Sequence, residues 1–176
     1  MRVIAGRFRG RRLKAPRGRG VRPTSDRVRE AVFGILGEAV EEARVLDLYA
    51  GTGALALEAL SRGARSATCV ERDPAALALL EANVTALELA DQVRIVRDDA
   101  MRFARNASEQ WELVFCDPPY ADDLAAVGRH GVGGSLWTVA CVLEHAARTE
   151  PAPAPPGARA DTRRYGDTAV TLYWRR

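Results

Sequence analysis

The chain has 176 residues, of which 47% are hydrophobic and 28% charged, and its formal net charge at pH 7 is +3. This length supports one sizeable hydrophobic core and excludes two full domains of ordinary size. No apolar stretch approaches the roughly 20 residues of a membrane span, and the N-terminus is too basic and too weakly apolar for a secretory signal. We therefore expect a cytoplasmic, monomeric protein that does not associate with membranes.

The charge is distributed unevenly along the chain. Residues 1–29 contain eleven basic residues and a single acid, Asp26, which gives this segment a net charge of +10. Residues 159–176 carry +3, so residues 30–158 carry −10. A basic arm on an acidic body is typical of proteins that bind a polyanion through the arm. Glycines and apolar residues interrupt the arginines, which favours short strands and turns in the arm over a disordered tail without a partner.

A first helix is predicted to start at Thr24 or Ser25, either of which can cap it, and to run to about Ala43. Apolar residues between Val28 and Leu36 recur there at the spacing of one helical face. Strands and helices then alternate. In chain order we expect a strand at 45–49, a tight turn at 50–53, a helix at 54–62, a strand at 67–71, a helix at 74–87, a strand at 93–96, a short helix at 100–105 and a strand at 112–116.

The last third of the chain carries a weaker signal. One or two helical turns are expected within 122–129, a loop at 130–134 and a strand at 137–143. Four prolines within 151–157 indicate a loop, and residues 163–174 predict a terminal hairpin about Gly166-Asp167. The alternation predicts an α/β fold with a doubly wound, mainly parallel sheet.

A glycine turn after the first strand indicates a nucleotide site. Asp47 ends that strand, and Gly51 and Gly53 lead directly into a helix, with Ala56 at the third small position of a dinucleotide fingerprint. Glu71 ends the next strand, about where an acceptor for ribose hydroxyls is expected. The alternative, a glycine-rich turn without a ligand, does not explain Glu71.

Two cofactor classes fit this turn, NAD and S-adenosylmethionine. Asp47 and the backbone of Ala50 to Gly53 can take the ammonium and carboxylate of an amino-acid group, and Asp99-Ala100 offers an acceptor for an adenine amino group. A proline-rich loop ending in an aromatic residue has no purpose in an NAD enzyme. We therefore favour S-adenosylmethionine.

That loop is Asp117-Pro118-Pro119-Tyr120, which follows an apolar run ending at Cys116. Ligands of open α/β sheets bind at the carboxyl ends of strands. Two consecutive prolines supply no backbone N–H, so the carbonyl groups around them remain available as acceptors. A carboxylate, such carbonyls and an aromatic face suit a planar substrate that carries an amino group. A plain turn in which the aspartate caps a helix is the alternative.

The cysteines indicate neither disulfides nor a metal. Cys69, Cys116 and Cys141 each lie inside an expected apolar strand, where a thiol serves as a small buried side chain. The two histidines, His130 and His145, are not spaced from the cysteines or from each other as metal ligands are. We expect no metal site.

These motifs resemble, in order, those of class I methyltransferases that act on exocyclic amino groups. The segments 22–30 and 47–61 and the opening Arg2 to Gly6 more specifically resemble the RsmD family. That family methylates N2 of one guanine in bacterial 16S ribosomal RNA. The resemblance implies a Rossmann-like fold with a seven-stranded sheet, an antiparallel terminal hairpin and a small basic, β-rich extension.

The resemblance also implies the roles of individual residues. We expect S-adenosylmethionine on Asp47, Ala50, Gly51, Gly53, Glu71, Asp99 and Ala100, catalysis by Asp117, Pro118, Pro119 and Tyr120, and RNA contacts from Arg7, Arg9, Arg11, Arg12, Lys14 and Arg22. The extension is expected to span 1–22 and the methyltransferase domain 23–176. The expected partner is 16S rRNA within a 30S subunit or an assembly intermediate.

Two other functions stay open on the sequence. The Asp-Pro-Pro-Tyr motif also serves DNA adenine-N6 methyltransferases, although the chain has no room for an inserted recognition domain. A catalytically silent RNA-binding or ribosome-assembly module is the second alternative, and the intact motif residues argue against it.

Overall fold

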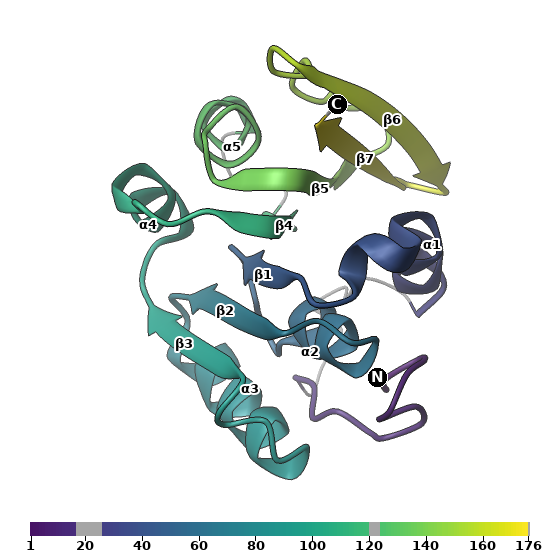
Figure 1. The fold of residues 1–176 in the computed structure, drawn as a ribbon, viewed down its shortest axis with the longest axis vertical. Helices are drawn as coiled ribbons and strands as arrows, with labels where there is room; N and C mark the ends of the chain where they lie inside the picture. The colour runs from purple at the N-terminus through teal and green to yellow at the C-terminus, as the bar shows by residue number, and fades with distance from the viewer. Residues whose placement is uncertain (17–25, 120–123, 176) are drawn as a thin grey trace.

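The computed structural model describes residues 1–16, 26–119 and 124–175, and they form one seven-stranded sheet with helices on both faces (Figure 1). The strand order is β3-β2-β1-β4-β5-β7-β6. The first five strands in this order are parallel, and β7 runs antiparallel to both β5 and β6. The expected Rossmann-like sheet with its antiparallel terminal hairpin is confirmed.

The elements of the first half follow the predicted alternation. They are α1 (Asp26–Leu36), the 3-10 turn η1 (Gly37–Val40), β1 (Arg44–Asp47), α2 (Ala54–Ser61), β2 (Ser66–Glu71), α3 (Pro74–Ala86), β3 (Val93–Arg97), α4 (Ala100–Asn106) and β4 (Trp111–Cys116). The first helix ends earlier than the expected Ala43. Gly37 adopts a left-handed φ of 52°, which turns the chain out of the helix after Leu36.

The second half contains α5 (Leu124–Val127), a wide helical turn η2 (Gly128–Val132), β5 (Trp137–Ala146), β6 (Ala158–Tyr165) and β7 (Thr168–Arg175). The loop expected at 130–134 is therefore partly helical, because η2 continues α5 as far as Val132. The strand expected at 137–143 extends to Ala146, since β7 pairs with it along its whole carboxyl half. The hairpin about Gly166-Asp167 is confirmed.

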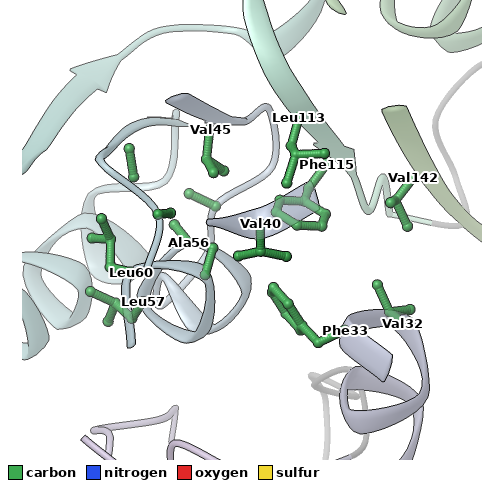
Figure 2. Close-up of a cluster of buried hydrophobic side chains, with 14 of the residues drawn as sticks. Val32, Phe33, Val40, Val45, Ala56, Leu57, Leu60, Leu113, Phe115 and Val142 are labelled. Carbon is green, nitrogen blue, oxygen red and sulfur yellow. The ribbon is translucent and has the colours of Figure 1, made fainter. Parts of the chain in front are cut away.

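Two helical layers cover the sheet. Helices α1, α2 and α3 bury their apolar side chains against one face, and α4, α5 and η2 pack on the other. Figure 2 shows the first layer, in which Phe33 of α1 meets Phe115 of β4 with ring centroids 5.6 Å apart. Val45, Leu113 and Val142 face the same cluster from three strands. Strands buried on both faces require the continuous apolar runs that the sequence shows.

The N-terminal residues 1–16 run beside α2 (Figure 1). Val3 and Leu13 are buried in the same core cluster as α1 and α2. The β structure expected in this segment is limited, among the described residues, to one antiparallel bridge between Arg2 and Arg12. Of the helices in the described part of the chain, none is both long and apolar enough to cross a bilayer.

Candidate functional site

A cavity of about 800 Å³ lies at the carboxyl edge of the sheet, where the strand order changes direction between β1 and β4. This size is typical of small-molecule sites. Its walls come from the segments that follow four parallel strands. The lining includes 47–52, 70–73, 98–100, 117–119 and Glu144. The structure therefore brings the expected cofactor residues other than Gly53, and Asp117 to Pro119 of the expected catalytic loop, into one cavity.

The glycine turn between β1 and α2 forms one wall. Gly51 and Gly53 have left-handed φ values of 54° and 83°, and the Gly53 N–H donates to the Ala50 carbonyl over 2.7 Å. Gly53 does not line the cavity. A Cβ there would lie 2.4 Å from Leu80 Cδ1, so this glycine lets α2 pack closely on α3. Gly51 lines the cavity itself, with open space around its Cα for an approaching ligand.

Asn83 of α3 holds this turn from behind. Its side chain is buried, and Nδ2 donates to the Thr52 carbonyl over 2.9 Å and to the Lys14 carbonyl over 3.1 Å. Its Oδ1 accepts the Lys14 N–H over 2.7 Å. One amide side chain thus ties the cofactor turn to the N-terminal arm.

Glu71 lies at the end of β2, next to the turn. Its Oε2 accepts the Gly51 N–H over 2.8 Å, and its Oε1 accepts the backbone N–H groups of Arg72 and Asp73. These bonds fix the carboxylate at the cavity wall. Since a carboxylate has about four acceptor positions and three are occupied, about one remains on Oε2 for a ligand hydroxyl.

Asp99 caps α4, because its Oδ1 accepts the N–H groups of Met101 and Arg102. Its Oδ2 forms an ion pair of 3.2 Å with Arg72. Both side chains of this pair are substantially exposed, so the pair is weak and an adenine amino group can replace the guanidinium at little cost. Ala100, the first residue of the helix, completes this end of the cavity.

Asp47 is the most unusual group in the site. It is 1% exposed, and neither carboxylate oxygen has a hydrogen-bond partner. Burial, together with the nearby charge of Asp117, raises its pKa to about 7. The nearby backbone amides of Tyr49 and Ala56 lower the pKa and partly oppose this shift. A buried acceptor without a donor is suited to a cationic ligand group.

The expected catalytic loop begins directly after β4. Asp117 is half-buried, Pro118 is buried and Pro119 is exposed, and all three line the cavity. Tyr120 lies outside the described residues. The loop therefore meets the cavity at the end of β4, next to the β1 end that carries Asp47.

The N-terminal arm, residues 1–16, is held to the body through α2. The carboxylate of Glu58, 1% exposed, accepts the N–H groups of Ile4 and Ala5 over 2.7 and 3.0 Å. Ser61 accepts the N–H of Arg7 on its carbonyl and that of Phe8 on its hydroxyl. These contacts hold the arm in one place on the body.

The side chains expected to contact RNA are mostly displayed on this docked arm. Arg7, Arg9, Arg11, Arg12 and Lys14 are exposed. Arg7 also stacks on the Phe8 ring at 4.5 Å, and Arg11 donates to the Ala86 carbonyl. Arg22 lies outside the described residues. The arm also reaches the cavity, which Met1 and Pro16 line.

The structure places no group of three or more His, Cys, Asp or Glu side chains of the described residues where they could bind a metal ion. Cys69, Cys116 and Cys141 are free and buried, as their positions within apolar strands predicted.

A family model described as conserved hypothetical protein 95 matches residues 1–174. The chain belongs to this family, the RsmD family. It is 44% identical over 120 residues to the ribosomal RNA small subunit methyltransferase D of Escherichia coli (strain K12), and the match covers 68% of this chain and 60% of that protein. The relative of the same name from Haemophilus influenzae is 36% identical over 128 residues, covering 71% of this chain and 66% of that protein.

Solved structures agree with this RsmD-family assignment. The yhhF protein of Escherichia coli superimposes with a TM-score of 0.86 at 34% identity, covering 99% of this chain and 97% of that one. A hypothetical protein of Thermus thermophilus gives a TM-score of 0.84 at 35% identity, with 98% of both chains covered. In sequence, the chain spans about three-fifths of the Escherichia coli relative, whereas in structure it matches yhhF almost throughout.

Two residues of this RsmD-family site escaped the sequence reasoning. Asn83 looks in sequence like a polar position on an otherwise apolar helix, and nothing local shows that it bonds to two distant segments. Glu144 lines the cavity from β5, and its only sequence signal is an acid near the end of a strand. Both depend on contacts between segments far apart in the chain.

Proposed function

We propose that this protein transfers a methyl group from S-adenosylmethionine to the exocyclic N2 of a guanine in 16S rRNA. One observation carries the proposal, namely that the Asp117-Pro118-Pro119 loop opens into the same cavity as the acid and glycine turn of a nucleotide site. A group donor and an amino-group acceptor then meet within one enclosed space.

The residues present fit S-adenosylmethionine. The unpartnered carboxylate of Asp47 suits the ligand's ammonium, and the backbone of Ala50 to Gly53 suits its carboxylate. Glu71 would accept a ribose hydroxyl, and Asp99 with Ala100 would hold the adenine. When bound, this cofactor supplies a methyl group whose carbon–sulfur bond electrons stay on sulfur as the bond to N2 forms.

A guanine amino group is a weak nucleophile, because its lone pair is delocalised into the ring. The catalytic loop makes this amino group more reactive. The Asp117 carboxylate and the Pro118 carbonyl each accept one N–H of N2, which directs the lone pair into the cavity. The same carboxylate stabilises the positive charge that develops on N2, until one N2 proton leaves to solvent. Tyr120 would stack on the base, which must be turned out of any helical stack.

Support for an rRNA substrate comes from the names of the relatives and from the arm. Two RsmD-family relatives are named ribosomal RNA small subunit methyltransferases. The exposed arginines of the arm lie on the α2 and α3 side of the molecule, and the arm itself borders the cavity. Phosphate contacts give affinity without sequence information, so we propose that the shape of a 30S subunit or assembly intermediate selects the guanine.

The test is methyl transfer to defined particles. The purified protein and tritiated S-adenosylmethionine are incubated with 30S subunits, and separately with naked 16S rRNA, from a bacterium that lacks its own RsmD-family gene. Mass spectrometry of the nucleosides should then show N2-methylguanosine. N6-methyladenine instead would support an adenine methyltransferase. Binding of S-adenosylhomocysteine without transfer to either substrate would contradict the proposal.

The contribution of the arm is tested by removing charge from positions that do not hold it in place. The double variant Arg9→Gln/Arg12→Gln should bind RNA more weakly. The slope of the logarithm of its RNA-binding constant against the logarithm of salt concentration should become about one to two units less steep. Cofactor binding should stay unchanged. An unaltered salt slope would show that the RNA is bound elsewhere.

A further inference from the structure

Glu144 lies near the carboxyl end of β5, directly beside the catalytic loop. Strands β4 and β5 are parallel, and their paired residues end with Cys116 opposite Leu143. Asp117 is the first residue after β4, and Glu144 is the next residue of β5. Neighbouring strands lie about 4.8 Å apart, so these two acids are adjacent at the same edge of the sheet.

The two side chains also share the cavity. Phe115 and Val142 belong to the core cluster under α1 and α2, whereas Cys116 and Leu143 face the opposite cluster. Successive side chains of a strand alternate between faces, so Glu144 lies on the side of Val142, and Asp117 follows directly after the end of β4. Both line the 800 Å³ cavity, and Glu144 is half-buried there.

We propose that Glu144 recognises the target base by accepting the N1–H of guanine. This inference rests on the proposed function and specifies which base the site takes. Guanine presents N1–H directly beside its N2 amino group. With N2 held by Asp117 and the Pro118 carbonyl, an acceptor for N1–H is needed beside that loop, and Glu144 is the acidic residue that β5 places in the cavity.

The same carboxylate rejects adenine. Adenine carries an unprotonated N1 beside its amino group, so its lone pair would face a negative charge in a partly buried site. The carboxylate attracts an N–H donor and repels a lone pair, so a site with this acid beside the base discriminates against a ligand that lacks the N1 hydrogen. Asp117 alone lacks this selectivity, since the amino groups of both bases can donate to it.

The test uses 2-aminopurine, which keeps the amino group at C2 but has no N1–H. The guanine that the native protein methylates is mapped first, and 30S particles are then reconstituted with guanine or 2-aminopurine at that position. The native protein should prefer guanine in kcat/KM. In Glu144→Ala the ratio of kcat/KM for guanine to that for 2-aminopurine should fall by at least about 10-fold and up to about 100-fold, mainly because guanine reacts more slowly. Glu144→Gln, whose amide can donate to an unprotonated N1, should favour 2-aminopurine relative to the native protein.

Glu150→Gln is the matched control, because it removes one charge from an exposed position outside the cavity. Its preference should equal that of the native protein, and S-adenosylhomocysteine binding should be alike in all variants. An unchanged ratio of guanine to 2-aminopurine in both Glu144 variants would overturn the inference, even if their overall rates fall. Failure of the native protein to form N2-methylguanosine would instead overturn the proposed function.

Discussion

The docking of the N-terminal arm can be tested at a single glycine. Gly6 has a left-handed φ of 79°, and a Cβ built on it would lie 1.8 Å from the carbonyl oxygen of Ser61. That oxygen belongs to the backbone of α2, so no rotamer change relieves the clash and the arm must lift. Gly10 is the matched control, since its φ is 82° but a Cβ there meets nothing within 4 Å.

The two alanine variants should therefore differ by the energy of docking. Gly10→Ala carries only the left-handed backbone penalty, about 1 kcal/mol. Gly6→Ala carries that penalty and also breaks three hydrogen bonds around Ser61, those from Arg7 N–H, from Phe8 N–H and to the Ala5 carbonyl. At about 1 kcal/mol each, the total reaches about 4 kcal/mol.

The free energies of unfolding of both variants are measured by urea denaturation, monitored by tryptophan fluorescence and extrapolated linearly to zero urea. The Gly6 variant should also bind RNA more weakly, because it keeps every arginine but loses their placement. Equal free energies of unfolding for the two variants, within about 0.5 kcal/mol, would refute the docking described here.

Three further predictions concern the cavity. Asp117→Ala should abolish methyl transfer yet leave S-adenosylhomocysteine binding nearly intact by calorimetry; normal turnover would remove this residue from the mechanism. Asp47 has a pKa raised to about 7, so a bound ammonium must displace its proton at lower pH. The affinity of the native protein for S-adenosylhomocysteine should therefore fall by up to tenfold for each pH unit below about 7, and binding there should release a proton. The Asp47→Asn variant should bind weakly, and its affinity should not depend on pH in this range. Asn83→Leu removes the hydrogen bond to the Thr52 carbonyl and should weaken cofactor binding about tenfold, whereas Thr85→Ala on the exposed side of the same helix should leave it unchanged. Equal affinities of the two variants in calorimetric titrations with S-adenosylhomocysteine would show that Asn83 does not hold the turn.

Local patterns in the sequence determined most of the architecture. Apolar runs bounded by glycine, proline and acidic residues predicted β1 to β4 and the helices between them, because each such element is specified by its own neighbours in the chain. The hairpin of β6 and β7 was equally local. The predicted ends of three elements were wrong. The observed ends at Leu36 and Val132 depend on the local backbone conformation, and the end at Ala146 depends on pairing with β7.

The sequence by itself also predicted that the glycine turn at Gly51 and the Asp117-Pro118-Pro119 loop lie together, since both follow strands and parallel strands end at one edge. Only the tertiary structure decided how distant segments share that edge. It buried Asp47 without a partner, docked the arm on Glu58 and Ser61, and brought Glu144 beside Asp117. These relations depend on strand order and packing, which no short window of sequence contains, and the proposed choice of guanine depends on them.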